Sequence, residues 1–131
     1  MITLDTSALY ALVNRRDPSH DAIRNLVLSD GGPLLVPAGI LAEIAYLIEQ
    51  RFPHSLDAFL ADLESGALTI VCDDDIARVR RLVARNADLP LGIADASVVA
   101  CAERHGGRVA TFDRRFGVVE REGRLSVLPT P

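Results

Sequence analysis

The chain has 131 residues, 49% of them apolar, which predicts a single domain spanning residues 1–131 with a core of its own. Its net charge is −4, and all 14 basic residues are arginines because no lysine occurs. These values exclude a protein that binds nucleic acid through bulk attraction to phosphates and any mechanism that needs a lysine. No apolar run approaches the ~18 residues that span a membrane and no signal-peptide pattern opens the chain, so we expect a cytoplasmic protein.

Strands and helices are predicted to alternate along the whole chain. Short apolar runs predict strands that end at Leu4 and that cover residues 34–36, 68–72, 108–111 and 125–128. Apolar residues three and four positions apart predict helices over residues 7–13, 18–28, 38–50, 56–63, 76–87 and 93–102. This alternation predicts an α/β fold, a three-layer α/β/α sandwich with a central, mainly parallel sheet.

Local residue chemistry sets several of these boundaries. Asp17 is interpreted as the N-cap of the second helix, with Pro18 as its first residue. The three aspartates at 73–75 resemble a metal cluster, but we interpret them as a helix start, because acids favour the first turn. A loop over 88–92 leads into the helix at 93–102.

Four acidic residues occupy positions from which they can meet. Asp5 and Asp113 each follow a predicted strand. Asp95 lies in the first turn of a helix, and Glu43 lies on the apolar side of another. Taken singly, each has an ordinary explanation as a helix cap, a turn residue, a first-turn acid or the partner of an arginine. Parallel strands, however, present their carboxyl ends at one edge of the sheet, so all four are predicted to converge there.

Convergence of the four acids favours a metal site. Unpaired carboxylates within a few ångströms repel one another and raise each other's pKa, so such a cluster is costly without a cation. Hard oxygen ligands suit Mg²⁺ or Mn²⁺ better than zinc. Because the sequence has no lysine and no plausible nucleophilic cysteine or Ser/His/Asp set, this site fits hydrolysis of a phosphodiester by a metal-activated water.

Four stretches carry a family resemblance through their order and spacing, over nearly the whole length. They are Leu4-Asp5-Thr6-Ser7-Ala8, Glu43, Ala94-Asp95-Ala96, and Thr111-Phe112-Asp113 with Phe116. In these stretches the chain resembles PIN-domain proteins, and within that group it is similar to the VapC toxins of bacterial toxin–antitoxin pairs.

The resemblance implies a Mg²⁺- or Mn²⁺-dependent endoribonuclease whose catalytic, metal-binding acids are Asp5, Glu43, Asp95 and Asp113. Ser7 and Thr111 would support these carboxylates through hydrogen bonds. The resemblance also implies a homodimer and a cognate VapB-type antitoxin that occupies the pocket entrance. Surplus apolar residues on the third and fourth predicted helices and the turn between them also favour a homodimer: Leu41, Leu47, Ile48, Phe52, Leu56, Phe59 and Leu60.

The mechanism carries expectations about substrate and products. Attack by water leaves the RNA 2′-hydroxyl out of the reaction, so the products are predicted to have 5′-phosphate and 3′-hydroxyl ends. A recessed pocket favours single-stranded or loop RNA over a duplex. Arg114 and Arg115, which follow the last acid, are predicted to contact RNA phosphates.

Three other function classes compete with this interpretation. A receiver-like phosphoacceptor has this length and an acidic Mg²⁺ pocket on a parallel sheet, but it requires the lysine that this chain lacks. A phosphatase with an aspartyl nucleophile needs a second acid two residues after the first, where Ser7 stands. A non-catalytic signalling module, whether it binds Mg²⁺ or uses every acid as a helix cap, is the remaining alternative.

Overall fold

The computed structural model describes residues 1–72, 75–86, 88, 91–120 and 123–129. The strands are β1 (Ile2–Leu4), β2 (Leu34–Pro37), β3 (Thr69–Val71), β4 (Arg108–Ala110) and β5 (Ser126–Leu128). The helices are α1 (Thr6–Val13), α2 (His20–Asp30), α3 (Ala38–Arg51), α4 (Leu56–Ser65), α5 (Ile76–Arg85), α6 (Ile93–Arg104) and α7 (Phe116–Glu120), and a short 3₁₀ turn, η1 (Pro53–Ser55), joins α3 to α4.

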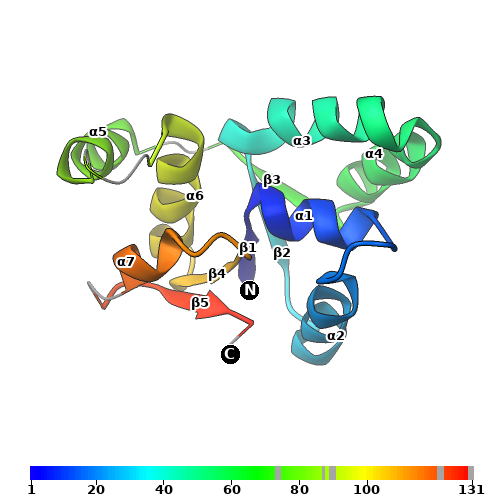
Figure 1. Cartoon of the computed structure of the whole chain (residues 1–131), viewed down its shortest axis with the longest axis horizontal. Helices are drawn as coiled ribbons and strands as arrows, with labels where there is room; N and C mark the ends of the chain where they lie inside the picture. Colours follow the sequence, from blue (N-terminus) through cyan, green and yellow to red (C-terminus); the bar gives the residue numbers. More distant parts are fainter. Residues whose placement is uncertain (73–74, 87, 89–90, 121–122, 130–131) are drawn as a thin grey trace.

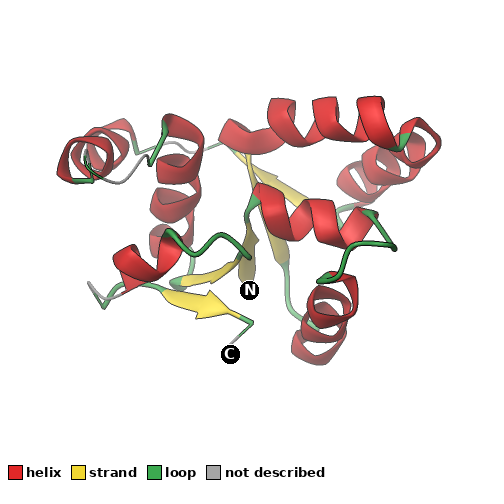
Figure 2. Cartoon of the chain, viewed as in Figure 1, coloured by secondary structure: helices red, strands yellow, loops and turns green. Residues whose placement is uncertain are grey.

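The strands form one sheet in the order β3-β2-β1-β4-β5, and every pairing between them is parallel. Figure 1 shows α1, α2 and α4 on one side of this sheet and α5, α6 and α7 on the other. The same view coloured by secondary structure separates the strands from the helices around them (Figure 2). The predicted three-layer α/β/α architecture is therefore confirmed, with a sheet that is wholly parallel among the described strands.

The strand order creates a crevice beside β1. From β1 the chain moves outward to β2 and β3, and it then crosses back through α5 and α6 to β4 on the opposite side of β1. Connections therefore leave the neighbouring strands β1 and β4 in opposite directions, which is where open α/β sheets bind ligands. Asp5 and Thr111, the residues that directly follow these two strands, lie at this point.

The hydrophobic core lies on both faces of the sheet, so the strands and the helix sides that face it are apolar. The side chains of Ile2, Leu4 and Val109 are fully buried in the central strands. Helix α6 is buried around most of its surface by small and apolar residues, which lets it lie close to β1 and β4. Within the described residues, no helix is long and apolar enough to cross a membrane.

The starts of α2 and α5 compare differently with the boundaries predicted from the sequence. Helix α2 begins at His20 and not at Pro18, because Asp17 makes a turn of its own: its side chain accepts from the Ser19 amide and its carbonyl accepts from the His20 amide. At α5, the predicted helix start is found, with Asp75 as the N-cap whose side chain accepts from the Arg78 amide. The parts of the prediction that concern Asp73, Asp74, Ala87, Leu89 and Pro90 lie outside the described residues.

Helices α3 and α6 make close contact at Gly39. An ideal Cβ atom on Gly39 would lie 2.9 Å from both Cβ and Oγ of Ser97 on α6. A Cβ does not fit at that distance, so glycine allows the two helices their present approach. This contact bears on the predicted site because α3 carries Glu43 and α6 carries Asp95.

We predict that Gly39→Ala lowers the free energy of unfolding by about 1–3 kcal/mol, because the added methyl group overpacks the contact with Ser97. Urea unfolding followed by circular dichroism measures the effect. Gly117→Ala in α7 is the matched control, since nothing lies within 4 Å of its added Cβ and alanine gains up to about 1 kcal/mol in a helix. A Gly39→Ala variant as stable as the parent would show that the two helices separate at no cost.

Candidate functional site

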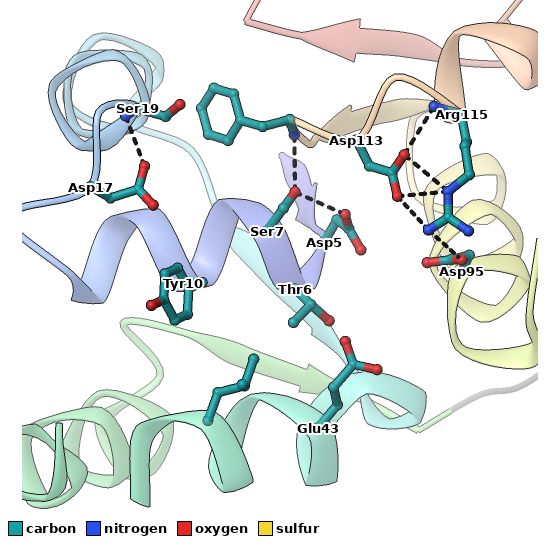
Figure 3. A pocket seen from close by; sticks show the side chains of 12 residues that line it. Asp5, Thr6, Ser7, Tyr10, Asp17, Ser19, Glu43, Asp95, Asp113 and Arg115 are labelled. Carbon is teal, nitrogen blue, oxygen red and sulfur yellow. Dashed lines mark hydrogen bonds and ion pairs between the residues drawn. The ribbon is translucent and has the colours of Figure 1, made fainter. Parts of the chain in front are cut away.

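An acidic pocket of about 370 Å³ opens at the carboxyl ends of β1 and β4. Figure 3 shows side chains from α1, α3, α6 and the loop after β4 pointing toward it. The lining brings together all four of the acids singled out from the sequence and adds a fifth, and its one described basic residue is Arg115. The five acids are Asp5, Asp17, Glu43, Asp95 and Asp113.

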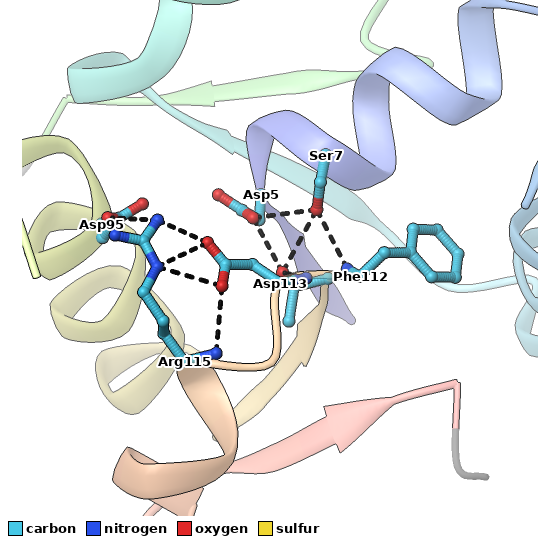
Figure 4. A network of polar contacts seen from close by, with 7 residues as sticks. Asp5, Ser7, Asp95, Phe112, Asp113 and Arg115 are labelled. Carbon is cyan, nitrogen blue, oxygen red and sulfur yellow. Dashed lines mark hydrogen bonds and ion pairs between the residues drawn. The ribbon is translucent and has the colours of Figure 1, made fainter. Parts of the chain in front are cut away.

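Two hydroxyl groups hold the Asp5 carboxylate in place. Thr111 Oγ1 donates to Asp5 Oδ2 at 2.7 Å, and Ser7 Oγ donates to the same oxygen at 3.0 Å (Figure 4). Each hydroxyl has one proton, so these two bonds use both, and the oxygens are left to accept from the main chain. Ser7 Oγ accepts from the Phe112 amide, and Thr111 Oγ1 accepts from the Asp113 amide. The network therefore joins the end of β1 to the loop after β4.

Asp5 is not explained by helix capping. It occupies the N-cap position of α1, yet its side chain makes no capping hydrogen bond to that helix. Its exposed fraction is only 4%. Burial raises the pKa of the Asp5 carboxyl above its ordinary value, although the hydrogen bonds from Thr111 and Ser7 lower it and Asp113 raises it further. The charged form of Asp5 is therefore costly in this pocket.

Asp95 faces the same pocket from the first turn of α6. The positive end of the helix dipole favours a carboxylate at that position. Burial nevertheless raises the pKa of Asp95; Arg115 opposes the shift, while the other acids of the pocket add to it. The helix dipole and one arginine thus offset only part of the cost of placing this charge here.

Asp113 is tied to Arg115 within a tight turn. Its Oδ1 accepts from the Arg115 amide at 3.0 Å, which is the Asx turn expected for an aspartate after a strand. The guanidinium folds back over the same carboxylate, with Nε 2.9 Å from Oδ2, and its Nη2 lies 3.2 Å from Asp95 Oδ2 (Figure 4). Hydrogen bonds from Arg115 lower the pKa of Asp113 below its ordinary value. Arg115 therefore bridges two of the converging acids.

Glu43 lies at the rim of the pocket and is exposed. The sequence placed it on the buried face of α3, but the buried residues of that helix are Ile40, Ile44 and Ile48. Its helix position points the side chain toward Thr6 at the pocket's edge, as Figure 3 shows. Glu43 contributes to the charge felt at Asp95, so it belongs to the same electrostatic cluster.

Sequence reasoning missed two members of this pocket. Asp17 lines it, although its position before a proline indicated only a helix cap. Thr6 Oγ1 also lines the pocket, and it is the one buried side-chain oxygen or nitrogen among the described residues that has no hydrogen-bond partner. A buried hydroxyl normally has a partner, so Thr6 marks a place where a ligand or water is needed. The sequence did offer a signal for Thr6, because it lies directly between Asp5 and Ser7, two residues already assigned to the site.

The donor set fits a hard divalent cation, but its present arrangement is not a closed coordination site. Among the described residues, no three acidic, histidine or cysteine side chains are placed to hold a metal ion as they stand. Arg115 supplies the positive charge between Asp95 and Asp113. Carboxylate oxygens and the Thr6 hydroxyl are the ligand chemistry that Mg²⁺ and Mn²⁺ prefer, and two raised pKa values show that more positive charge would be favourable.

Comparison with known proteins identifies the family of this chain. The family model described as PIN domain matches residues 2–122. Ribonuclease VapC26 of Mycobacterium tuberculosis is 34% identical over 133 aligned positions, which cover 96% of this chain and 98% of that protein.

Solved structures share the fold at lower identity. VapC20 of Mycobacterium tuberculosis, described as a sarcin-ricin loop cleaving toxin, has a TM-score of 0.75 at 21% identity and covers 91% of this chain and 95% of its own. VapBC2 of Rickettsia felis, solved with a DNA fragment from its promoter, has a TM-score of 0.71 at 18% identity and covers 97% of each chain. FitAcB of Neisseria gonorrhoeae has a TM-score of 0.66 at 18% identity and covers 98% of this chain and 97% of its own. The chain belongs to the PIN-domain family and is a homologue of the VapC ribonuclease toxins.

Proposed function

We propose that this VapC-type protein is an endoribonuclease that depends on Mg²⁺ or Mn²⁺ and leaves 5′-phosphate and 3′-hydroxyl ends. The observation that carries the proposal is the convergence of Asp5, Asp95 and Asp113 in one partly buried pocket, with Glu43 at its rim. A relative named as a ribonuclease and 34% identical over almost the full length supports RNA as the substrate. The phosphoacceptor alternative has less support, because the chain has no lysine and belongs to another family.

The four acids Asp5, Glu43, Asp95 and Asp113 would hold the metal. A bound Mg²⁺ or Mn²⁺ ion lowers the pKa of a water molecule and offsets the charge of the phosphate under attack. Ser7 and Thr111 orient the Asp5 carboxylate, and their own acceptor bonds to main-chain amides prevent the hydroxyls from turning away. This is the support that ligating carboxylates require from their neighbours.

The two arginines after β4 have different environments. Arg115 is held by Asp113 and Asp95, so in this state it balances charge in the pocket. When the acids bind a cation, the same guanidinium can contact a phosphate next to the cleaved bond. Arg114 is exposed and lines a neighbouring groove beside Thr111 and Phe112, where it can contact a flanking phosphate.

The partners follow from the same chemistry. A VapB-type antitoxin that presents an arginine would pair with the acidic pocket and exclude metal. VapBC2 is by its name a toxin–antitoxin pair, which supports such a partner here. VapC20 cleaves an RNA loop, the sarcin-ricin loop, which supports loop RNA as the substrate class of this chain. A cytoplasmic location fits such a substrate.

The homodimer stays a prediction, and fewer of the apolar residues that favoured it are available at the surface. Ile48 and Phe59, two of the seven apolar residues behind it, belong to the core. Leu60 is 50% exposed, and Tyr46 on α3, which the sequence argument did not use, is 61% exposed. An apolar surface on α3 and α4 therefore persists, with a different composition.

We predict that Asp5→Asn and Asp95→Asn remove RNA cleavage, because each takes a charged ligand from the pocket. Ser7→Ala and Thr111→Val should lower activity by about 10–100-fold through loss of support for Asp5. Asp57→Asn, an exposed acid on α4, is the matched control and should keep parental activity. Cleavage of a labelled RNA hairpin and chemical analysis of its ends test this; 2′,3′-cyclic phosphates or full activity in EDTA would contradict the mechanism.

We predict that Arg115→Ala tightens Mn²⁺ binding by about tenfold, which corresponds to ~1.4 kcal/mol, because the guanidinium competes for Asp95 and Asp113. Isothermal titration calorimetry with MnCl₂ measures the constant. Arg114→Ala removes an equal charge from an exposed neighbouring position and serves as the control. If both variants bound Mn²⁺ like the parent, competition by Arg115 would be ruled out.

We predict opposite stability changes for Asp95→Asn and Asp113→Asn in metal-free buffer at pH 7.5. The folded-state pKa of Asp95 is raised, so its charge destabilises the fold at neutral pH and asparagine should raise the melting temperature. The folded-state pKa of Asp113 is lowered, so its charge stabilises the fold and asparagine should lower the melting temperature.

Both differences should fade in acid. The gain at Asp95 disappears as pH falls through its raised pKa toward 3.8, and the loss at Asp113 disappears once pH has fallen below its lowered pKa. Added Mn²⁺ should stabilise the parent but not Asp95→Asn. Thermal melts between pH 7.5 and pH 3 measure these changes, and equal Mn²⁺ shifts in parent and variant would count against Asp95 as a ligand.

A further inference from the structure

A second pocket, of about 570 Å³, has the opposite charge. It lies where the loop between α1 and α2 meets the end of α3 and η1. Figure 1 shows the loop between α1 and α2 on its right-hand side. Its described lining contains cationic and aromatic side chains and no acidic residue: Val13, Asn14, Arg15, Arg16, Arg51, Phe52, His54 and Ser55. In a chain with net charge −4, this concentration of arginines calls for a specific explanation.

Other arginines of the described residues form ion pairs within the fold, whereas those of this pocket do not. Arg78 and Arg108 each form an ion pair with a carboxylate that links distant parts of the chain. Within the described part of the molecule, Arg15, Arg16 and Arg51 form no ion pair, and all three are exposed. Their charges are therefore available to a ligand.

The second pocket adjoins the acidic pocket through an aromatic wall. Tyr10 lines the acidic pocket, while Phe52 lines the basic one, and their ring centroids lie 5.6 Å apart. Arg51 Nη1 donates to the Tyr10 hydroxyl at 2.8 Å, and its guanidinium lies 5.6 Å from the Tyr10 ring centroid. The acidic pocket and the arginine-lined pocket are therefore neighbours, joined by the contacts of Tyr10 with Phe52 and Arg51.

We propose that this pocket, formed by Arg15, Arg16, Arg51, Phe52 and His54, binds the single-stranded RNA segment next to the nucleotide that is cleaved. The inference rests on the proposed ribonuclease function and adds a substrate subsite to it. Planar guanidinium groups match phosphate oxygens, and RNA carries one phosphate per nucleotide. Phe52 offers a face on which a base can stack without regard to sequence.

An acidic protein segment is the competing ligand for such a pocket, and two observations favour RNA. The pocket adjoins the proposed site of phosphodiester cleavage through the contacts of Tyr10 with Arg51 and Phe52, so a strand bound at that site can reach it. It also combines cationic groups with an aromatic face, the pairing that single-stranded nucleic acid uses.

The test compares two double variants of equal charge. Arg15→Ala/Arg16→Ala empties the pocket of two cations, and Arg24→Ala/Arg80→Ala removes two exposed arginines that line neither pocket. Binding of a fluorescein-labelled oligouridylate of twelve nucleotides is followed by anisotropy in EDTA, where metal-dependent cleavage stops. Cleavage of the same RNA in Mn²⁺ gives kcat and KM.

For Arg15→Ala/Arg16→Ala we expect RNA binding weaker by about tenfold or more, a KM higher by a similar factor, and kcat within about twofold of the parent. The slope of log binding constant against log salt should shrink by about 1.4, the value for two lost phosphate contacts on a single strand. Arg24→Ala/Arg80→Ala should behave like the parent. Unchanged Mn²⁺ affinity in both variants would confirm that the acidic pocket is intact.

The remaining outcomes each overturn the subsite. Equal losses in both double variants would mean bulk charge attraction without a subsite. Parental RNA binding by Arg15→Ala/Arg16→Ala, together with weaker binding of a polyglutamate peptide, would assign the pocket to an acidic protein segment. If the parent cleaves RNA while Arg15→Ala/Arg16→Ala is unaffected, only the subsite fails; if the parent neither binds nor cleaves RNA, the proposed function fails with it.

Discussion

The charge of several carboxylates held in one partly buried pocket is the constraint on which the rest of this site depends. Asp5 is 4% exposed and burial raises its pKa, so its charged form depends on stabilisation by neighbouring groups. Two hydroxyl groups donate to it, α1 begins directly after it, and Arg115 adds positive charge nearby. These features offset the cost without removing it, which leaves a pocket that favours an added cation.

The sheet topology explains why such distant residues meet. Asp5 and Thr111 follow neighbouring parallel strands whose connections leave in opposite directions, and this places them at one crevice. Asp95 reaches the crevice because α6 is built from small residues that let it lie against β1 and β4. The contact at Gly39 then sets the distance between α6 and α3, which carries Glu43. The geometry of the acidic pocket is therefore a product of backbone packing.

The features that follow from backbone periodicity could be predicted from the sequence. Strand ends and the alternation of elements follow from the apolar runs and their spacing. The convergence of Asp5 and Asp113 follows from their positions just after two strands of a parallel sheet. The pairing of Arg115 with Asp95 could not be predicted, because it depends on a side-chain rotamer and on charges brought together only by folding. Glu43 was placed on the buried side of α3 because it lies three residues after Ile40. The structure leaves it exposed at the pocket rim, and hydrophobic periodicity does not distinguish a rim position from a buried one.

Two pockets of opposite charge resolve an apparent conflict between a net charge of −4 and an RNA substrate. Charges beyond roughly 8–10 Å are largely screened at physiological ionic strength, so a phosphate responds to local charge more than to the total. In the proposed function, the acidic pocket would repel a phosphate until a cation enters, whereas the arginine-lined pocket would attract the strand without one. In the proposed function, metal and RNA would reinforce each other's binding, since the cation would cancel the repulsion that the strand meets at Asp5, Asp95 and Asp113. The Tyr10–Phe52 pair lies between the two pockets, so in the proposed function the arginines on one side would bind the strand while the acids on the other side would hold the metal.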